Sequence, residues 1–448
     1  MDISLIPQFG GLLMTVIAFV VALSVIVAVH EYGHYIVGRW SGIKAEVFSL
    51  GFGPVLWSRH DQHGTKWQIA ALPFGGYVKF LGDSNAASAK DEDVVYGLSD
   101  EEARHSMHGA PLWARSATVA AGPIFNFILS ILVFAGVVLW QGQVAEPLTV
   151  GSFHDMPGEM QQELREGDEV IAIGGVQVPA FEDRAAFRDF GDAVPVEPVL
   201  DYDIRREARE MRVRGPYPYP PMVRQLSPQS SAYDIGMKVG DVITEVDGEP
   251  IFAFEQLRER VESGEGKPLL LSVWRDGEML EFSLVPRRVD EPQEEGGYKT
   301  SWRIGIAGGL MFEPATETAG VGTALWEGVI QTERIIEGSI SGLWHMVTGA
   351  ISSCNMSGPI GIAQVSGAMA SQGAASFIWF IAVLSTAVGL LNLFPVPVLD
   401  GGHLVFYAYE AVAGRPPSDR ALRALMTIGL TLILSLMVFA LSNDLFCP

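Results

Sequence analysis

Four long apolar stretches constrain the fold of this chain more than any other feature of its sequence. They cover roughly residues 11–38, 114–140, 375–397 and 424–441, and most of the charged side chains lie between them. A helix of about 20 apolar residues is long enough to cross a hydrocarbon core of about 30 Å. The sequence therefore predicts a membrane α-helical bundle of four transmembrane helices.

The charge of the chain limits what it binds. The formal net charge is −22 over 448 residues. A nucleic-acid partner calls for a basic face, so we expect none, and we expect the lipid bilayer to surround the apolar stretches. The first ten residues contain neither Lys nor Arg, and the first apolar stretch is too long for the core of a signal peptide. We interpret it as a retained membrane helix.

Basic residues beside the apolar stretches indicate which loops face the cytoplasm, because Lys and Arg concentrate on that side. They follow the first stretch, precede or open the second, and separate the third from the fourth: Arg39, Lys44, Arg59, Arg104, Arg115, Arg415, Arg420 and Arg423. We therefore expect residues 39–113 and 398–423 to be cytoplasmic, and both termini and the large central region to be outside. With no organelle signal visible, this arrangement fits a multi-pass protein of a bacterial inner membrane.

A short motif, His30-Glu31-Tyr32-Gly33-His34, lies at the end of the first apolar stretch. In a helix His30 and His34 share one face, so their rings can bind one Zn²⁺, with Glu31 beside them as general base. The pattern also occurs by chance, and two histidines at a membrane interface are the plain alternative. Ionisable side chains at the end of a membrane helix are costly, which favours a functional site.

The end of the third apolar stretch offers a third ligand. Residues 392–402 read N-L-F-P-V-P-V-L-D-G-G, in which two prolines break the helix. Asp400 and His30 follow the outer ends of their membrane helices at similar distances, so both should reach a similar depth at the inner side. A catalytic zinc takes three protein ligands and keeps one position open, which fits His30, His34 and Asp400. The alternative for Asp400 is a turn residue before two glycines.

Two further segments carry glycine and proline in informative places. Residues 66–80 predict a hairpin of β-strands around one proline and a Gly-Gly pair. This hairpin is unusually apolar for a cytoplasmic loop, so it is either an ordinary soluble hairpin or a re-entrant one that touches the membrane. Within the second apolar stretch, Gly122-Pro123 and Asn126 predict close helix packing with a buried hydrogen bond. We favour a packing role for them, without chemistry.

The region between the second and third stretches contains an internal repeat. Residues 167–175 (GDEVIAIGG) match 240–248 (GDVITEVDG), and 180–182 match 253–255 at the same offset of 73 residues. Each copy alternates short strands with a helix, which predicts two small α+β modules in tandem. The acidic, glycine-containing residues 290–297 are interpreted as a linker.

Two features of the last third of the chain stay open. Residues 320–352 carry apolar side chains at helical spacing, which indicates either an amphipathic helix on the outer membrane surface or a helix packed against the modules. Cys354 and Cys447 are the two cysteines of the sequence. They exclude a disulfide framework, and the sequence does not decide whether they pair.

Taken together, these motifs resemble the site-2 protease family of intramembrane zinc metalloproteases, and most closely its bacterial regulator of sigma-E protease group. The shared motifs are H-E-x-x-H, G-F-G-P at residues 51–54, Gly122-Pro123 with Asn126, and N-x-x-P-x-P-x-L-D-G ending at Gly401. They occur in the family's order and span essentially the whole chain. The repeated modules resemble bacterial PDZ domains.

The resemblance implies a role for each matching residue. His30, His34 and Asp400 match the ligands of one Zn²⁺ per chain. Glu31 matches the general base, and Asn392 matches an asparagine that holds the substrate backbone near the metal. A membrane-associated β element that pairs with an unwound substrate by strand addition is matched by Gly75, Gly76, Tyr77 and Val78.

The implied architecture inserts a periplasmic tandem of two PDZ-like α+β domains between the second and third transmembrane helices. We expect five parts: transmembrane helices 1 and 2 with the HEYGH motif and a cytoplasmic re-entrant hairpin (1–141), PDZ-like domain 1 (142–215), PDZ-like domain 2 (216–290), a periplasmic linker with an amphipathic helix (291–374), and transmembrane helices 3 and 4 (375–448). Residues 156–164 lack the small-residue run usual in such modules. This speaks against binding of peptide termini by the first module and favours a role in restricting access.

The function implied is hydrolysis of a peptide bond within a transmembrane segment of a substrate, near the cytoplasmic face. The substrates implied are membrane anti-sigma factors after a first extracytoplasmic cut, as in a stress response, and remnant signal peptides. The main alternative is a PDZ-bearing membrane scaffold that binds unfolded envelope proteins, but it has no use for the four site residues. A metal transporter would need more carboxylates and histidines within the apolar stretches.

Overall fold

The computed structural model divides the chain into two compact units. We call residues 1–137 and 321–448 the membrane unit and residues 138–320 the inserted unit. The residues that the structure describes are 9–83, 99–158, 162–181, 183–293 and 297–447.

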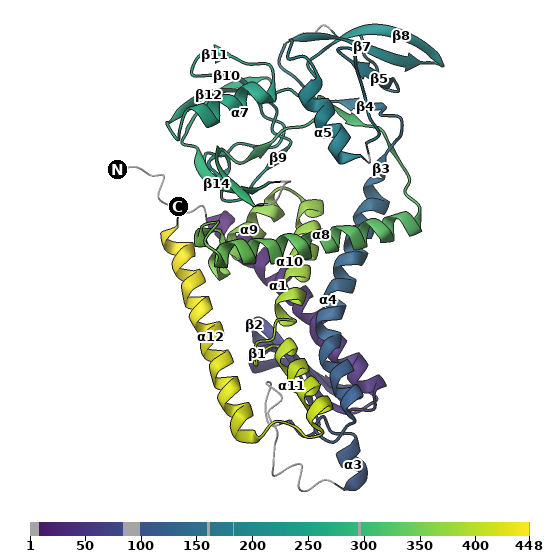
Figure 1. The fold of residues 1–448 in the computed structure, drawn as a ribbon, viewed down its shortest axis with the longest axis vertical. Helices are drawn as coiled ribbons and strands as arrows, with labels where there is room; N and C mark the ends of the chain where they lie inside the picture. The colour runs from purple at the N-terminus through teal and green to yellow at the C-terminus, as the bar shows by residue number, and fades with distance from the viewer. Residues whose placement is uncertain (1–8, 84–98, 159–161, 182, 294–296, 448) are drawn as a thin grey trace. The chain divides into compact units, whose positions relative to one another are not determined.

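The membrane unit is mostly helical (Figure 1). The helices among its described residues are α1 (Phe9–Trp40), α3 (Asp100–Arg104), α4 (Leu112–Gln141), α8 (Val321–Val347), α9 (Pro359–Ser371), α10 (Ala374–Asn392), α11 (Asp400–Ala413) and α12 (Asp419–Phe446), with a 3₁₀ turn at Ser353–Asn355. Four of them, α1, α4, α10 and α12, are long and apolar enough to cross a membrane. The four predicted membrane helices are therefore confirmed as helices.

The chain between α10 and α12 differs from the prediction. α10 ends before two prolines, and residues 393–399 form tight turns. α11 then begins at Asp400 and ends before Gly414, whose φ of +70° closes the helix in the left-handed conformation. Segment 398–423, expected to be a loop, is therefore largely helical, and Asp400 stands in the first turn of a helix.

A long antiparallel hairpin of β1 (Ala45–His60) and β2 (Lys66–Phe80) completes the membrane unit. Val47 in the first half of β1 lies opposite both Lys66 and Lys79, so β2 pairs with this part of β1 on both sides. The last residues of β2 therefore form an edge of the curled sheet.

The sequence predicts a hairpin within residues 66–80 alone, and this prediction is wrong. The partner strand is β1, and the turn lies between β1 and β2. Gly51 and Gly53 have φ of +89° and +84°, so they bend β1.

The C-terminal end of α12 is fixed to the chain between α8 and α9. Cys354 and Cys447 form a disulfide. The Asp444 carboxylate accepts hydrogen bonds from the backbone amides of Gly358, at 2.7 Å, and Ile360, at 3.0 Å. These bonds cap the start of α9, so the question that the two cysteines left open is answered by one bridge.

Helix α8 confirms the predicted helical spacing of residues 320–352. It approaches α4 closely at Gly328, where an added Cβ would lie 2.4 Å from the Ile131 carbonyl oxygen. Trp326 and Trp344 of α8 are 63% and 64% exposed. Exposed tryptophans are typical of a membrane–water interface, which fits the membrane-surface alternative.

The inserted unit contains the predicted repeat. The first copy forms a sheet in the order β6-β5-β7-β8 and the second a sheet in the order β11-β10-β12-β13, which is the same topology. Their elements are β5 (Glu169–Ile173), β6 (Val176–Gln177), α5 (Arg184–Ala193), β7 (Val199–Arg206) and β8 (Arg209–Pro216), then β10 (Val242–Val246), β11 (Glu249–Pro250), α7 (Phe254–Ser263), β12 (Leu269–Arg275) and β13 (Glu278–Leu284). Each copy has a buried apolar core, so the sequence repeat is a structural repeat.

A returning segment closes the inserted unit. Its strands pair in reverse order with strands that precede or separate the two sheets: β16 (Ile306–Ala307) with β9 (Gln225–Leu226), β17 (Phe312–Pro314) with β4 (Val150–Phe153), and β18 (Thr316–Glu317) with β3 (Gln143–Val144). The short helix α6 (Ser231–Asp234) opens the second copy. The entry and exit of the unit therefore lie side by side at β3 and β18.

The linker predicted at residues 290–297 is not a linker in the described residues. They lie in the hairpin of β14 (Arg287–Pro292) and β15 (Tyr298–Arg303). The Arg303 guanidinium donates to both carboxylate oxygens of Glu291, at 2.7 and 2.6 Å. This pairing neutralises Glu291, one of the acidic residues for which the stretch was interpreted as a linker.

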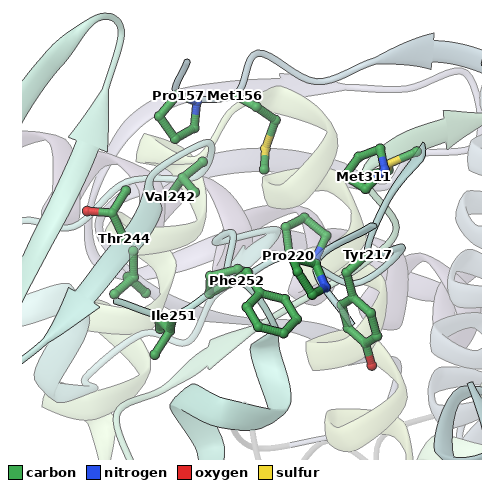
Figure 2. Close-up of a pocket in the computed structure, with 13 residues that line it drawn as sticks. Met156, Pro157, Tyr217, Pro220, Val242, Thr244, Ile251, Phe252 and Met311 are labelled. Carbon is green, nitrogen blue, oxygen red and sulfur yellow. The ribbon is translucent and has the colours of Figure 1, made fainter. Parts of the chain in front are cut away.

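A pocket of about 150 Å³ lies between the two copies of the repeat (Figure 2). Apolar side chains from both copies line it, among them Met156, Pro157, Tyr217, Val242, Ile251 and Phe252. No charged side chain is among its lining residues in the part of the chain that the structure describes. A pocket of this size and polarity can hold a single apolar side chain.

Candidate active site

Three of the predicted site residues meet in the membrane unit. His30 and His34 lie one turn apart on α1, and Asp400 opens α11. His30 Nε2 lies 3.1 Å from His34 Nε2 and 3.2 Å from Asp400 Oδ2, and His34 Nε2 lies 3.5 Å from Asp400 Oδ2. The side chains are only 12–18% exposed. These residues form the one group of three or more His, Cys, Asp and Glu side chains, among the residues described, that could hold a metal ion.

The separations between these three atoms fit a tetrahedral metal site. Bonds of about 2.0–2.1 Å to a tetrahedral zinc separate neighbouring ligand atoms by about 3.3 Å. Asp400 Oδ2 is buried and accepts no hydrogen bond from the described residues. Three atoms with lone pairs therefore converge on one point without a donor between them, which is unfavourable unless a cation lies there.

Hydrogen bonds on the far side of each ring leave both Nε2 atoms free. His34 Nδ1 lies 2.8 Å from the backbone carbonyl oxygen of Thr118, which can only accept, so Nδ1 carries the proton and Nε2 the lone pair. Asn126 Nδ2 lies 3.2 Å from His30 Nδ1, and the buried Asn126 Oδ1 has no hydrogen-bond partner among the described residues. The two ends of an amide can exchange places, so Oδ1 can accept the Nδ1 proton and free His30 Nε2 likewise.

Gly122 leaves room for an ion. A Cβ added at Gly122 would lie 2.3 Å from His34 Nε2, 2.5 Å from His34 Cε1 and 2.8 Å from His30 Cε1. Any larger residue would place its side chain where a ligand of Nε2 must lie. The space beside the two rings is therefore a property of α4, and the residues present fit a bound metal.

The hairpin lies directly against the helix that carries Glu31. A Cβ added at Gly76 would lie 2.9 Å from Val27 Cγ1 and 3.2 Å from Glu31 Cγ. Tyr77 stacks on Phe52 across the sheet, with ring centroids 5.9 Å apart. The edge formed by the end of β2 therefore runs past Glu31.

The remaining predicted residues take different positions. Gly75 has a φ of +137°, and Val78 is buried in the core between the hairpin and α1. Asn392 is the last residue of α10 and is half-buried, just before the turns that lead to Asp400. No contact given by the structure joins Asn392 to the His-His-Asp group in the described chain.

Sequence reasoning missed the contribution of α4. Gly122 and Asn126 were expected to serve packing alone, and Thr118 was not singled out, yet all three lie beside the histidines. Their spacing of four residues, repeated, places them on one face of a helix. That spacing is the signal which could have identified Gly122 and Asn126.

Fold and site together define a class of protein. The described residues include four helices able to cross a membrane, and one of them carries an H-E-x-x-H motif whose histidines meet a distant carboxylate. This is the ligand arrangement of a metallopeptidase set in a multi-pass membrane protein. The model of Peptidase family M50 matches residues 18–436, and the chain belongs to this family, that of the site-2 proteases.

Relatives at 32–36% identity agree with this assignment. A protein of Agrobacterium fabrum that carries a zinc metalloprotease name is 36% identical over 444 residues, covering 97% of each chain. A similarly named protein of Brucella suis is 34% identical over 441 residues, covering 96% of this chain and 95% of its own. The regulator of sigma-E protease RseP of Salmonella typhimurium is 32% identical over 463 residues, covering 97% of this chain and 99% of its own. The protein is therefore a zinc metallopeptidase.

Proposed function

We propose that this protein is an intramembrane endopeptidase that cuts transmembrane segments of its substrates near the cytoplasmic face. His30, His34 and Asp400 bind one zinc ion, and Glu31 is the general base. The observation that carries the proposal is the convergence of three lone-pair atoms beside Gly122, at the end of a membrane helix.

Each protein group has a defined task in this proposal. A bound zinc ion supplies Lewis-acid chemistry, which makes a water acidic near neutral pH and polarises the scissile carbonyl. The Glu31 carboxylate takes the proton of the attacking water and returns it to the leaving amine. Thr118 and Asn126 hold the two imidazole rings with their Nε2 atoms toward the metal.

Substrate binding is assigned to the edge of β2. A transmembrane helix hides its backbone carbonyls, so it must unwind before hydrolysis. An extended segment can add to residues 75–78 as a further strand, and the backbone hydrogen bonds gained would offset part of the cost of unwinding. Asn392 supplies a side-chain contact to the substrate backbone.

The disulfide supports the proposed orientation in a bacterial inner membrane. Disulfides persist in oxidising compartments such as the periplasm and are rare in the cytoplasm. Cys354 lies between α8 and α9 and Cys447 follows α12, and the distribution of Lys and Arg also places both segments outside. We infer that both termini and the inserted unit are periplasmic and that the histidines lie toward the cytoplasm.

We infer further that the inserted unit consists of two PDZ-like domains that act as a size filter. The two matching sheets support this reading, because each copy of the repeat combines a four-stranded sheet with a helix between its second and third strands in chain order. The filter admits substrates already shortened by a first extracytoplasmic cut. Membrane anti-sigma factors and remnant signal peptides are of this kind, which would make the enzyme part of a stress response by regulated intramembrane proteolysis.

The test is cleavage of a tagged single-span substrate by the purified full-length protein in detergent. We expect wild type to cut within the span, and both Glu31→Gln and a zinc chelator to reduce the rate by at least 1,000-fold, as loss of general base or metal should. Equal cutting by wild type and Glu31→Gln would show that another group is the base. No cutting of several substrates by zinc-loaded wild type would favour the scaffold alternative.

A further inference from the structure

A partly buried ion pair joins α4 to the far end of the helix that begins with Asp400. Arg115 Nη1 donates to Glu410 Oε2 at 3.1 Å, and Arg115 Nη2 donates to Glu410 Oε1 at 2.6 Å. The two side chains are 14% and 19% exposed, and the guanidinium also lies over the Tyr407 ring, 5.2 Å from its centroid. This planar two-point contact fixes the relative orientation of the two side chains as well as the distance between them.

Neither charge benefits its own helix. Arg115 lies in the first turn of α4, where the helix dipole disfavours a cation, and Glu410 lies in the last turn of α11, where it disfavours an anion. Each residue is thus unfavourable within its element and favourable only across the contact. The pair serves to connect the two helices.

Apart from this pair, α11 is held by the partly buried Leu404 and Tyr407, which pack against the core formed by α1, α4 and the hairpin. Its fully buried residues are Gly401 and Gly402, at its start, and no side chain caps its N-terminus at Leu399. Before it come the irregular turns of residues 393–399, and after it comes the left-handed Gly414. Fixing the C-terminal end of α11 therefore restricts where its N-terminal end, which carries Asp400, can lie.

The same face of α4 reaches all three metal-ligating residues. Arg115, Thr118, Gly122 and Asn126 follow one another at steps of three, four and four residues, and so share one face. Thr118 orients His34 and Asn126 contacts His30. Asp400 and Glu410 are separated by about 15 Å along α11, so Arg115 reaches Asp400 only through that helix.

We propose that the Arg115–Glu410 ion pair is a positioning clamp that holds Asp400 against His30 and His34. The clamp rests on the proposed metal centre and adds to it two residues outside the family motifs quoted above. In this proposal α4 positions all three ligands. It orients the rings of His30 and His34 directly, and it positions the Asp400 carboxylate through α11. Loss of the clamp lowers metal affinity without removing a ligand.

Zinc affinity of the full-length protein tests the clamp apart from catalysis. Purified wild type, Glu410→Gln and the reversed pair Arg115→Glu/Glu410→Arg are titrated with zinc against a competing chelator, with monodispersity as a check of folding. We expect Glu410→Gln to need at least tenfold more free zinc for half occupancy. Substitution of residues that support metal ligands commonly lowers metal affinity by this much. The reversed pair restores the contact and suits both helix dipoles, so it should recover most of the affinity.

A matched control is Glu291→Gln, which breaks another two-point Arg–Glu pair, that with Arg303 in the inserted unit. It should bind zinc as wild type does. If Glu410→Gln fails to fold, Arg115→Lys replaces it in the test. This variant keeps the positive charge but loses the two-point guanidinium contact, so it too should need at least tenfold more free zinc for half occupancy.

Wild-type affinity in Glu410→Gln, or a reversed pair no better than the single variant, would overturn the clamp and leave the metal centre intact. A wild type that binds no zinc would overturn the proposed function and the clamp with it.

Discussion

Among single residues, Gly122 determines whether an ion has room between the two histidines. In the variant Gly122→Ala the new methyl group would lie 2.3 Å from His34 Nε2, so the ring must move or the metal must leave. We expect zinc affinity and cleavage to fall by at least 100-fold. Metal analysis after dialysis and the cleavage rate measure the two effects.

Gly136→Ala on the same helix is the control for Gly122→Ala. An added Cβ at Gly136 meets nothing within 4 Å. Both substitutions gain about 1 kcal/mol of helix propensity, so a general effect on α4 would appear in both. Zinc binding by Gly122→Ala equal to that of Gly136→Ala would show that Gly122 does not border the metal.

At this scale the sequence identifies groups that carry chemistry and misses groups that act by position. The convergence of His30, His34 and Asp400 could be predicted, because a motif and matching depths pointed to it. The role of Thr118 could not, because it supplies a backbone carbonyl, and any residue has one. Gly122 contributes by having no side chain. A search of the sequence for metal ligands does not detect such a residue.

At the scale of elements, one ion pair recurs in both copies of the repeat. Asp168 accepts two hydrogen bonds from Arg206, each at 2.7 Å, and Asp241 accepts two from Arg275, each at 2.6 Å. Both aspartates are 1% exposed. Burial alone would raise the pKa of Asp168, but the hydrogen bonds from Arg206 and the Arg165 amide hold that pKa below its usual range.

Asp168→Asn should therefore destabilise the inserted unit by about 2 kcal/mol at pH 7. The folded carboxyl has the lower pKa, so its stabilisation is complete above about pH 4 and is lost as the pH falls further. The advantage of wild type over Asp168→Asn should shrink at pH 3. Hydrogen exchange of peptides from β5 to β8 in urea, in the full-length protein, gives the free energy of unfolding.

Asp203→Asn is the surface counterpart in the same sheet. Asp203 also accepts two hydrogen bonds, from Arg212, but these side chains are 36% and 63% exposed. Exposed pairs contribute about 0–1 kcal/mol, so this variant should stay close to wild type. Equal losses in the two variants would refute the argument from burial.

The elements that the sequence predicted are those with a regular pattern. The membrane helices are long apolar stretches and the repeat recurs at a fixed offset, and the structure contains both. β14 was missed because the acidic residues of 290–297 resemble a solvated loop, while in the structure Arg303 pairs with Glu291. β1 was missed because two glycines interrupt its pattern, and only pairing with β2 on both sides makes it a strand.

For the whole molecule, the disulfide predicts an orientation that labelling can measure. In cells Cys354 and Cys447 should be oxidised. After mild reduction of intact spheroplasts they should react with a membrane-impermeant maleimide. In a cysteine-free variant carrying Gln62→Cys, at the exposed turn between β1 and β2, labelling should require permeabilised cells. Labelling of that cysteine in intact spheroplasts would contradict the proposed orientation.

The proposed size filter belongs to the scale of the whole molecule, and the structure shows where the inserted unit can be removed. β3 and β18 bring the entry and exit of the unit together, and the Ala145 amide donates to the Ala315 carbonyl oxygen at 2.8 Å. When a short Gly-Ser turn replaces residues 146–314, the pair of β3 and β18 remains and joins the two ends of the chain. An excision that ends at residue 290 would instead cut through β14 and leave β15 to β18 without their partner strands.

If the inserted unit is a filter, its removal should raise cleavage of a full-length substrate with its extracytoplasmic domain by at least tenfold. Cleavage of the same substrate already shortened outside should stay within about twofold, because the metal site is untouched. Product gels of both substrates in detergent compare the two rates, and Glu31→Gln in the deleted protein must abolish both. Unchanged resistance of the full-length substrate would refute the filter. Loss of both activities, with zinc still bound, would instead make the inserted unit part of substrate binding.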